Sequence, residues 1–349
     1  MRRHCLLGKP IYNLLEDQFT LLLVNPKHFR AVPGRKTDVR DAEWLADLLR
    51  HGLLRASYVP ARPERELREL TRYRTTLVQQ RSEVVNRVHK TLEGANIKLS
   101  SVASDLMGKS GRRMLAALAA GTTDAGALAD LAKDKLRKKL PELERALAGR
   151  MGEHQRFLLQ QQLAHIEFLE QAIAQVSAEI QERLRPFEAE LARLETIPGI
   201  GRRVAELLVA EIGADMSRFG SAAHLASWAG MCPGQNESAG KRKSSRTRKG
   251  SPWLRSALIE AAHGAARSKG TYLGAQACRL KPRLGWKKTM VAVGHSILVR
   301  VYYLLQRGTT YAEPGAEYFT ERDRQALERR HVRALERLGY RVVLEADAA

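Results

Sequence analysis

The first 60 residues alternate short apolar runs with polar, turn-forming segments. Residues 10–17 and 38–52 have the apolar spacing of helices, and the second pattern ends at Gly52. Residues 19–25 (FTLLLVN) and 57–60 (SYVP) have the composition and length of strands. Continuous aliphatic strands that alternate with helices are typical of parallel sheets, so we expect an α/β layer here.

From Pro63 the apolar spacing predicts a long basic helix. Its apolar side is marked by Leu67, Leu70, Leu77, Val84 and Val88, and its other sides carry Arg65, Arg68, Arg72, Arg74, Arg81 and Arg87. Such a basic face either lies along phosphates or is simply solvated, and the pattern alone favours neither.

Further helices are expected between residues 100 and 150, and a seven-residue apolar repeat follows at residues 151–185. The repeat consists of Leu159, Ile166, Ile173 and Ile180 at one position and Leu169 and Val176 at another. It predicts a coiled-coil helix that ends at Pro186. Its partner is either a helix of the same chain or the same helix of a second copy.

The second half shows no strand-like alternation between residues 186 and 310, so we expect it to be mostly helical. The predicted fold is α/β plus all-α. Its parts are a partial α/β domain (1–62), a helical continuation with the basic helix (63–150), the coiled-coil helix (151–186), a C-terminal domain (187–310) and a charged tail with a helix and a short strand (311–349).

Composition points to a nucleic-acid partner. The 349 residues give room for two domains, and a formal net charge of +21 attracts phosphate polyanions, although a merely soluble basic chain would share that charge. Cys5, Cys232 and Cys278 are too widely spaced for a disulfide framework or a zinc knuckle, which favours a reducing cytosol. Charge interrupts the apolar runs, so no segment is expected to cross a membrane.

The tract IPGIGRRVAELL (197–208) predicts a helix-hairpin-helix that binds DNA backbone. Gly199 and Gly201 let the backbone approach a phosphate, and the N–H groups that open the next helix point at the anion. Arg202 and Arg203 add positive charge there. The alternative is an ordinary glycine turn between packed helices, and the two arginines favour the DNA-binding interpretation.

Asp38 and Asp41 stand three residues apart at the start of a predicted helix, so their carboxylates project from one face. Two such groups can ligate Mg²⁺, which stabilises charge during phosphoryl transfer. Acidic residues also favour helix N-termini because they cap the helix and complement its dipole. Spacing alone favours capping.

A tract at residues 230–259 places a serine in a polar loop with dense positive charge. Ser238 lies among small residues, and the cations that follow it are Lys241, Arg242, Lys243, Arg246, Arg248 and Lys249. A hydroxyl in such a field could attack a phosphodiester. Ser244, Ser245 and Ser251 compete on spacing, and the alternative is a basic loop that merely holds DNA.

Long tracts of the chain resemble a known family. They are VNPKHFRAVPGRKTDVRDAEWLADLLRHGLLRASYVP, LRELTRYRTTLVQQRSEVVNRVHKTLEGANIKLSSVASDLMGKSGRRML, IPGIG and CPGQNESAGKRKSSRTRKGSPWLR. From about Lys9 to Gly308 the sequence resembles insertion-sequence transposases that join an N-terminal RuvC-like DEDD domain to a C-terminal serine-bearing domain. That family is related to pilin-gene invertases and includes bridge-RNA-guided recombinases.

The resemblance implies a partial RuvC/RNase H-like α/β domain and a cooperative mechanism. Asp38 and Asp41 take the place of the last two acids of the DEDD set, and Ser238, in the pattern Pro233, Ser238, Gly240, is the nucleophile. It also implies Mg²⁺, DNA as substrate, a dimer or tetramer, a noncoding guide RNA as an additional partner, and a bacterial cytosolic, nucleoid-associated location.

The chain departs from the family at its start. The first Asp of the set is missing and its Glu position falls on Arg2. We therefore expect a truncated or decayed copy with weakened Mg²⁺ binding, since hard cations need several converging oxygen ligands. The competing functions are a metal-only nuclease, which would need Asp38 and not Ser238, and an inactive DNA-binding copy.

The candidate site therefore has three parts. Ser238, Asp38 and Asp41 are the catalytic residues, and the same two aspartates are the metal ligands. The nucleic-acid-binding candidates are Arg35, Lys36, Arg72, Arg74, Arg81, Arg87, Gly199, Gly201, Arg202, Arg203, Lys241, Arg242, Lys243, Arg246, Arg248, Lys249 and Arg255.

Overall fold

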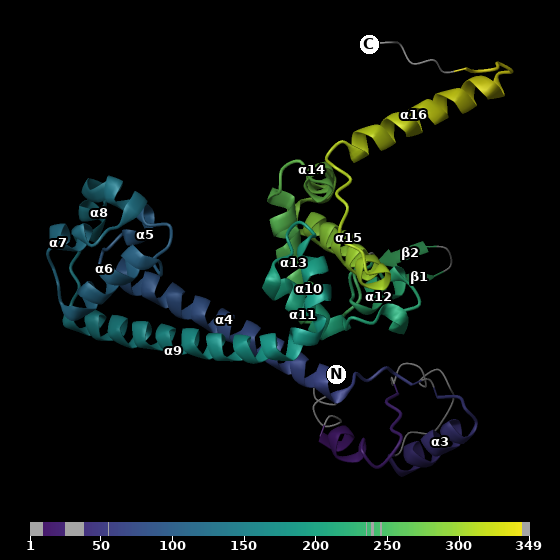
Figure 1. Cartoon of the computed structure of the whole chain (residues 1–349), viewed down its shortest axis with the longest axis horizontal. Coiled ribbons are helices and arrows are strands. Elements are labelled where there is room, and N and C mark those ends of the chain that lie inside the picture. The colour runs from purple at the N-terminus through teal and green to yellow at the C-terminus, as the bar shows by residue number, and fades with distance from the viewer. Residues whose placement is uncertain are drawn as a thin grey trace. The chain divides into compact units, whose positions relative to one another are not determined.

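The computed structural model describes residues 10–24, 38–54, 56–234, 236–238, 241–244 and 246–343, with the backbone alone at residues 38–41, 236–238, 241–244 and 325–326. The chain divides into two compact units, Met1–Arg65 and Glu66–Ala349. Helix α4 (Arg62–Gly94) begins in the first unit and continues through the second (Figure 1).

The first unit contains the two helices that the sequence predicts. Residues 10–15 are helical, and α3 spans Asp38–Arg50. Gly52, with φ +67°, ends α3 in a left-handed turn, where the Leu53 N–H donates to the Leu48 carbonyl at 2.9 Å. The predicted stop at Gly52 is therefore confirmed.

The predicted pair of parallel strands is wrong for the described residues. Val24 and Ala56 form one isolated antiparallel bridge, beside a hydrogen bond from the Ser57 N–H to the Leu23 carbonyl. Leu22 and Leu23 are exposed rather than covered. An aliphatic run becomes a buried strand only when neighbours cover both faces, and the described part of this unit supplies no such neighbours.

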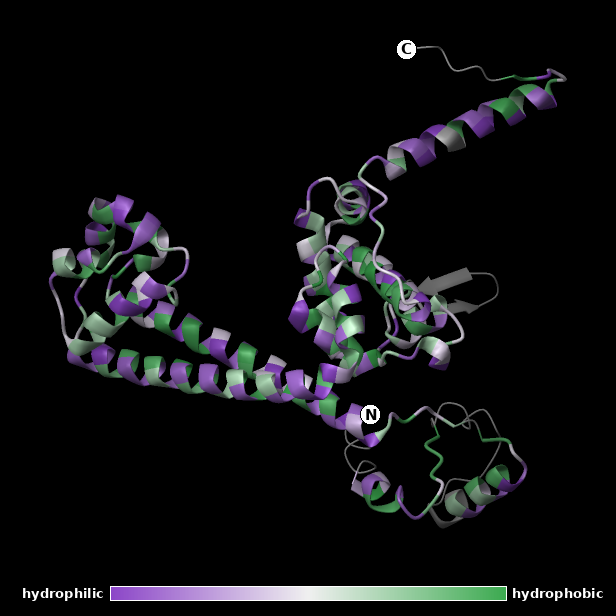
Figure 2. Ribbon diagram, viewed as in Figure 1, coloured by the Kyte–Doolittle hydropathy of each residue, from purple (hydrophilic) through white to green (hydrophobic). Residues whose placement is uncertain are grey.

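The second unit is organised around a long helical hairpin. Helix α9 (Glu153–Leu184) lies alongside α4, and the two run antiparallel (Figure 1). Their side chains meet in the pairs Glu66–Arg183, Arg81–Glu170 and Thr91–Gln162. The heptad residues of α9 are buried or half-buried, whereas its exposed side is mixed, with many polar residues and the exposed Phe157 and Phe168 (Figure 2). The partner of the predicted repeat is therefore a helix of the same chain.

One end of this hairpin carries a small helical cap. The cap consists of α5 (Leu99–Val102), α6 (Lys109–Ala120), α7 (Ala125–Asp130), the 3₁₀ helix η1 (Asp134–Lys139) and α8 (Leu140–Leu147). Their apolar residues join Leu77, Val84, Val88 and Leu92 of α4 in a hydrophobic cluster of their own. Gly121 ends α6, and Pro141 lies in the first turn of α8.

The other end carries the C-terminal helical domain. Its elements are η2 (Arg185–Phe187), α10 (Glu188–Glu195), α11 (Arg202–Ile212), η3 (Met216–Arg218), α12 (Ala222–Trp228), β1 (Asn236–Ser238), β2 (Lys241–Ser244), α13 (Pro252–Arg267), α14 (Tyr272–Leu284) and α15 (Trp286–Arg307). Helix α15 contacts α10, α12, α13 and α14, and its buried residues from Met290 to Leu304 form the centre of a second hydrophobic cluster.

The mostly helical prediction for this domain is confirmed, with one exception. The polar loop expected around Ser238 contains a short antiparallel hairpin, β1–β2. In the tail, α16 (Tyr318–Arg337) is the expected charged helix and is largely hydrophilic (Figure 2). Residues 341–343, the described part of the expected tail strand, are not in a strand.

Candidate active site and nucleic-acid interface

Ser238 is the last residue of β1 and lies directly opposite Lys241, the first residue of β2. Only residues 239 and 240 separate the two along the chain. Glu237 pairs with Arg242 in the same register, and an irregularity follows between Asn236 and Glu237. The serine is thus held by backbone pairing next to a cationic residue, where the sequence suggested a polar loop.

Close backbone packing fixes the base of this hairpin. Pro233 and Thr247 form an antiparallel bridge, and the Gly234 N–H donates to the Arg246 carbonyl at 2.8 Å. A Cβ on Gly250 would collide with the Ala229 carbonyl, so these two segments meet through glycine. The hairpin therefore projects from a firmly packed stem.

Arg255 contributes to that stem. Its guanidinium donates to the Gly230 carbonyl at 3.2 Å and to the Thr247 hydroxyl at 2.8 Å, and so joins the two segments of the stem to α13. The sequence placed Arg255 among the nucleic-acid contacts. In the structure this side chain holds the hairpin in position.

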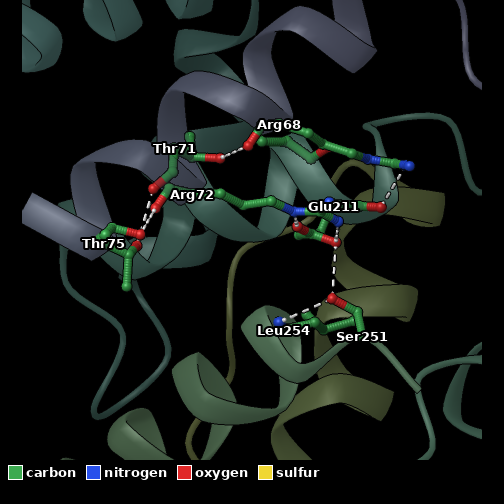
Figure 3. Close-up of polar contacts among 9 residues, drawn as sticks. Arg68, Thr71, Arg72, Thr75, Glu211, Ser251 and Leu254 are labelled. Atoms are coloured by element: carbon green, nitrogen blue, oxygen red, sulfur yellow. Dashed lines mark hydrogen bonds and ion pairs between the residues drawn. The ribbon is translucent and has the colours of Figure 1, made fainter. Parts of the chain in front are cut away.

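A buried glutamate holds the segment after the hairpin. Glu211 of α11 is 1% exposed, and its carboxylate accepts two hydrogen bonds from Arg72 (2.6 and 2.9 Å) and one from the Ser251 hydroxyl (3.0 Å). Figure 3 shows Arg72 and Ser251 reaching this carboxylate from different helices. Because the Ser251 oxygen also caps α13 by accepting from the Leu254 N–H, its hydroxyl has a structural role and is a poor competitor to Ser238 as nucleophile.

Arg68 strengthens the same junction. Its guanidinium donates to the carbonyls of Ala210 and Glu211 at 2.8 and 2.6 Å (Figure 3). A cation at the last carbonyls of a helix satisfies unpaired acceptors and complements the helix dipole. Two arginines one turn apart on α4 thus fasten the C-terminal end of α11.

A second ion-pair chain lies further along the same two helices. Arg74 is 5% exposed and donates to buried Glu206 at 2.6 Å. Arg202 also reaches Glu206, at 3.3 Å, and pairs with Glu188 at 2.6 Å, and this last hydrogen bond raises the pKa of Arg202. The guanidinium of Arg74 faces protein, so in this geometry a phosphate has no access to it.

The tract predicted to form a helix-hairpin-helix turn links α10 to α11, and its two glycines differ. Gly199 has φ +90°, and a Cβ there would collide with backbone atoms of Ala261 and Ala265 on α13. Its role is close helix packing. Gly201 meets nothing within 4 Å and Arg203 is exposed, so this pair remains open to a ligand at the start of α11.

The two remaining candidates on α4 are in different surroundings. Arg81 pairs with Glu170 of α9 at 2.7 Å. Burial alone would raise the pKa of the Glu170 carboxyl, but hydrogen bonds from Arg112 and Arg81 outweigh burial and hold that pKa below its usual value. Arg87 instead lines a groove between α4 and α9 with Lys90, His154 and Gln162, among others, and has no carboxylate partner among the described residues.

The other predicted site residues lie at the front of the chain or on and near the β1–β2 hairpin that carries Ser238, which we call the serine hairpin. Lys241, Arg242 and Lys243 belong to β2, and Arg246, Arg248 and Lys249 follow it as exposed residues. Arg35 and Lys36 lie outside the described residues. Asp38 and Asp41 are in the first turn of α3, with only their backbone described. Among the described side chains, no three of His, Cys, Asp and Glu form a metal-binding group.

Sequence reasoning missed the two buried glutamates. Glu206 and Glu211 lie in the otherwise apolar tract VAELLVAEIG of α11 and are 5% and 1% exposed. Carboxylates inside an apolar helix need cationic partners, because a buried unpaired charge is very costly. That rule, applied to α11 and to the arginine-rich α4 together, could have identified the contact.

Two separate regions of the chain match known protein families. Residues 191–276, which include α11 and the serine hairpin, match the family described as the transposase IS116/IS110/IS902 family. Residues 7–97, which include α3 and α4, match the DEDD transposase domain of IS110, described as a transposase. A protein of Pseudomonas aeruginosa named as a probable family 20 transposase is 26% identical over 256 residues, or 73% of this chain and 67% of that protein.

The two matched domains together define an enzyme that acts as a transposase. Both domains are ones that insertion-sequence transposases carry, and the chain is similar to those proteins in both regions. DEDD transposase domains generally act with divalent metal, and transposases bind DNA. No helix in the described part of the chain has the length and apolar character needed to span a bilayer.

Proposed function

We propose that this transposase cleaves and exchanges DNA strands with Ser238 as nucleophile, assisted by Mg²⁺ at Asp38 and Asp41. The observation that carries the proposal is the place of Ser238. It lies within the matched transposase region, at the end of β1, opposite Lys241 and on a packed stem. Residues directly opposite in an antiparallel pair are close cross-strand neighbours, so positive charge accompanies the serine.

The chemistry is a transesterification. The Ser238 oxygen attacks the phosphorus and loses its proton, one P–O bond of the phosphodiester breaks, and the departing sugar oxygen takes up a proton. The chain is then joined to one DNA strand through a phosphoserine ester. Attack of a second strand's hydroxyl on this ester releases the serine and joins the two strands. Cations beside the reacting phosphate stabilise the charge that builds on its oxygens.

The two aspartates fit a hard cation in their chemistry. They lie three residues apart in the first turn of α3, so both side chains start from one helix face, and carboxylate oxygens are the ligands that Mg²⁺ prefers. When bound, Mg²⁺ stabilises negative charge on phosphate oxygens. Because Mg²⁺ takes six oxygen ligands, Asp38 and Asp41 would need water, DNA or other carboxylates to complete the set.

The DNA backbone would lie along cations that have no carboxylate partner among the described residues. A phosphate would contact Gly201 and exposed Arg203 at the start of α11. Another would contact Arg87 in the groove between α4 and α9. Arg248 and Lys249 are exposed beside the stem of the serine hairpin. Arg72, Arg74 and Arg81, by contrast, are engaged by glutamates of the protein.

We also propose a homo-oligomer and an RNA partner, both on family resemblance. The apolar repeat of α9 is covered by α4 of the same chain, so it gives no reason to expect a dimer through this helix. Light scattering of the DNA-bound protein would measure the oligomeric state. Sequencing of RNA that copurifies with the chain would test for a guide, and a population without an element-derived RNA would remove that part of the proposal.

The decisive experiment traps the phosphoserine ester. The full chain is incubated with DNA that carries the element ends and Mg²⁺, and the covalent product is resolved on a denaturing gel. We expect Ser238→Ala to reduce the adduct by about 10³-fold or more, since loss of a nucleophile removes the covalent route. Ser244→Ala, which removes a hydroxyl from β2, is the matched control and should leave the adduct intact.

Two outcomes would support the competing functions. Strand cleavage that persists in Ser238→Ala but disappears in Asp38→Asn would identify a metal-dependent nuclease. Salt-sensitive DNA binding without any cleavage, in the wild-type chain and both variants, would identify a DNA-binding protein without catalysis. Either result would refute Ser238 as nucleophile in this chain.

A further inference from the structure

The helical cap at the far end of the α4–α9 hairpin carries a dense group of cations. Between residues 133 and 139 (KDKLRKK) five of seven residues are basic. They are Lys133, Lys135, Arg137, Lys138 and Lys139, and all five are exposed. None makes an ion pair with a described residue, although the acids Asp130, Asp134 and Glu142 lie in the same stretch. We call residues 133–139 the basic segment.

The fold holds this segment with its charges outward. Leu136 is half-buried in the cluster of the cap, and the Lys133 N–H donates to the Ser110 hydroxyl of α6 at 2.9 Å. Asp134 has φ +52°, the left-handed conformation that turns the chain into η1. Exposed Arg113, one turn after Ser110 on the same face of α6, extends the positive surface.

The surroundings fit a phosphate backbone better than a protein or a membrane. Protein interfaces and membrane-inserting faces need aromatic or aliphatic anchors. No large hydrophobic side chain is exposed among residues 95–152, which form the cap, and the exposed Phe157 and Phe168 lie outside it on α9. The surface instead carries positive charge that no ion pair with a described residue neutralises. A 3₁₀ helix of six residues, at about 2 Å per residue, is about 12 Å long, which is the rise of three to four nucleotides at about 3.4 Å each.

The segment is also separate from the serine hairpin. Helix α4 has 33 residues, and at about 1.5 Å per residue it is about 50 Å long. Leu67 near its start belongs to the cluster of the C-terminal domain, whereas Leu92 near its end belongs to the cluster of the cap. A duplex held at the basic segment is therefore held by a different part of the second unit from the part that carries Ser238.

From these observations we propose that the basic segment is a second, sequence-independent binding surface for the backbone of duplex DNA. The proposal rests on the proposed DNA-recombining function and assigns it a contact outside the catalytic domain. Each Lys or Arg that neutralises a phosphate releases counterions, so the surface should make a definite contribution to the salt dependence of binding.

The test removes three of the charges from the full chain. The variant carries Lys135→Gln, Lys138→Gln and Lys139→Gln, and the matched control carries Arg330→Gln, Arg333→Gln and Arg337→Gln on exposed positions of α16. Both lose the same charge. Dissociation constants for a 30-base-pair duplex of arbitrary sequence are measured across a salt series, and thermal unfolding of each variant checks that it folds.

We expect the segment variant to bind at least about tenfold more weakly at low salt. Its slope of log K against log salt should fall by about 2.7, at about 0.9 for each lost contact, while the control changes by less than threefold in affinity. Equal losses of DNA affinity in both variants would overturn the proposal. A segment variant that binds like wild type while Ser238 still forms its adduct would refute this surface and leave the proposed function standing.

Discussion

Two sets of basic residues in the second unit differ in what surrounds them. The arginines at the start of α4 meet the buried carboxylates of Glu206 and Glu211, whereas the cations of the basic segment have no carboxylate partner among the described residues. In sequence both look like positively charged helical surfaces. The difference teaches that charge density alone does not identify a nucleic-acid surface, because acids that lie more than a hundred residues away decide which cations remain available.

The energetics of the two sets differ for the same reason. A buried carboxylate without a cation is strongly destabilising, so the arginines of α4 and the glutamates of α11 must be kept together. Exposed cations contribute little to folding and their mutual repulsion is screened by salt. Substitutions in the first set should therefore change stability, and substitutions in the second should change binding.

The largest effect is expected at the Arg74–Glu206 pair. Glu206→Gln leaves a buried guanidinium without its carboxylate and should lower the free energy of unfolding by about 3 kcal/mol. Replacing both residues with Met should restore much of the loss, since a hydrophobic pair of similar volume avoids the desolvation cost. Denaturant unfolding measures both changes. Glu188→Gln on the exposed end of the same chain of ion pairs is the control, and an equal loss there would contradict the contrast.

A smaller loss is expected at Glu211. Glu211→Gln weakens two charged hydrogen bonds to Arg72 and the bond from Ser251, and we expect about 2 kcal/mol of destabilisation. Ser251→Ala removes the cap of α13 and should cost about 1 kcal/mol. The double variant, measured by the same denaturant titration, should lose less than the sum of the two, because the residues share a hydrogen bond. Simple additivity would mean that the network is not coupled.

The ion pairs of Glu170 with Arg81 and Arg112 should make the free energy of unfolding depend on pH. The pKa of Glu170 is held below the usual value by Arg112 and Arg81, so these pairs stabilise the fold above the unfolded pKa of about 4.3 and lose that contribution as the pH falls through the folded value. Since the carboxylate is 31% exposed, we expect under about 1 kcal/mol at pH 7. The free energies of unfolding of wild type and Glu170→Gln should differ at pH 7, and the difference should shrink as the pH falls below about 4.3 and through the folded pKa.

The smallest change in stability is expected at the basic segment. The triple variant Lys135→Gln, Lys138→Gln and Lys139→Gln removes three exposed charges without partners, so the free energy of unfolding should stay within about 0.5 kcal/mol of wild type. A thermal melt alongside Glu206→Gln makes the contrast direct. Strong destabilisation by the triple variant would mean that these lysines also make interactions that stabilise the folded protein.

The helices of this chain could be predicted from local pattern, and its contacts could not. The repeat of α9 and the stop at Gly52 depend on residues within one or two turns, which the sequence displays directly. The expected strand at residues 19–25 depends on neighbours elsewhere in the fold, and its prediction as part of a parallel pair was wrong. Arg74 was predicted to contact DNA because it is basic. Its actual partner, Glu206, is 132 residues away, and no local pattern relates the two.

The candidate site was only partly within reach of sequence reasoning. Ser238 and the two aspartates were singled out among equivalent serines and helix caps by family resemblance, and their roles stay predictions. The hairpin that holds Ser238, the stem contact of Arg255 and the packing of Gly199 against α13 all depend on close backbone approaches. Such approaches involve segments that composition and periodicity do not relate to one another.

The α4–α9 hairpin joins two apolar cores, and half-buried Val176 of α9 packs against both. Such an arrangement allows either core to open while the other stays intact, because the two share little besides these helices. Amide hydrogen exchange in the chain should therefore proceed in two cooperative blocks with different protection. Destabilising substitutions in α11 would then speed exchange around α15 and leave the amides of α6 as slow as before.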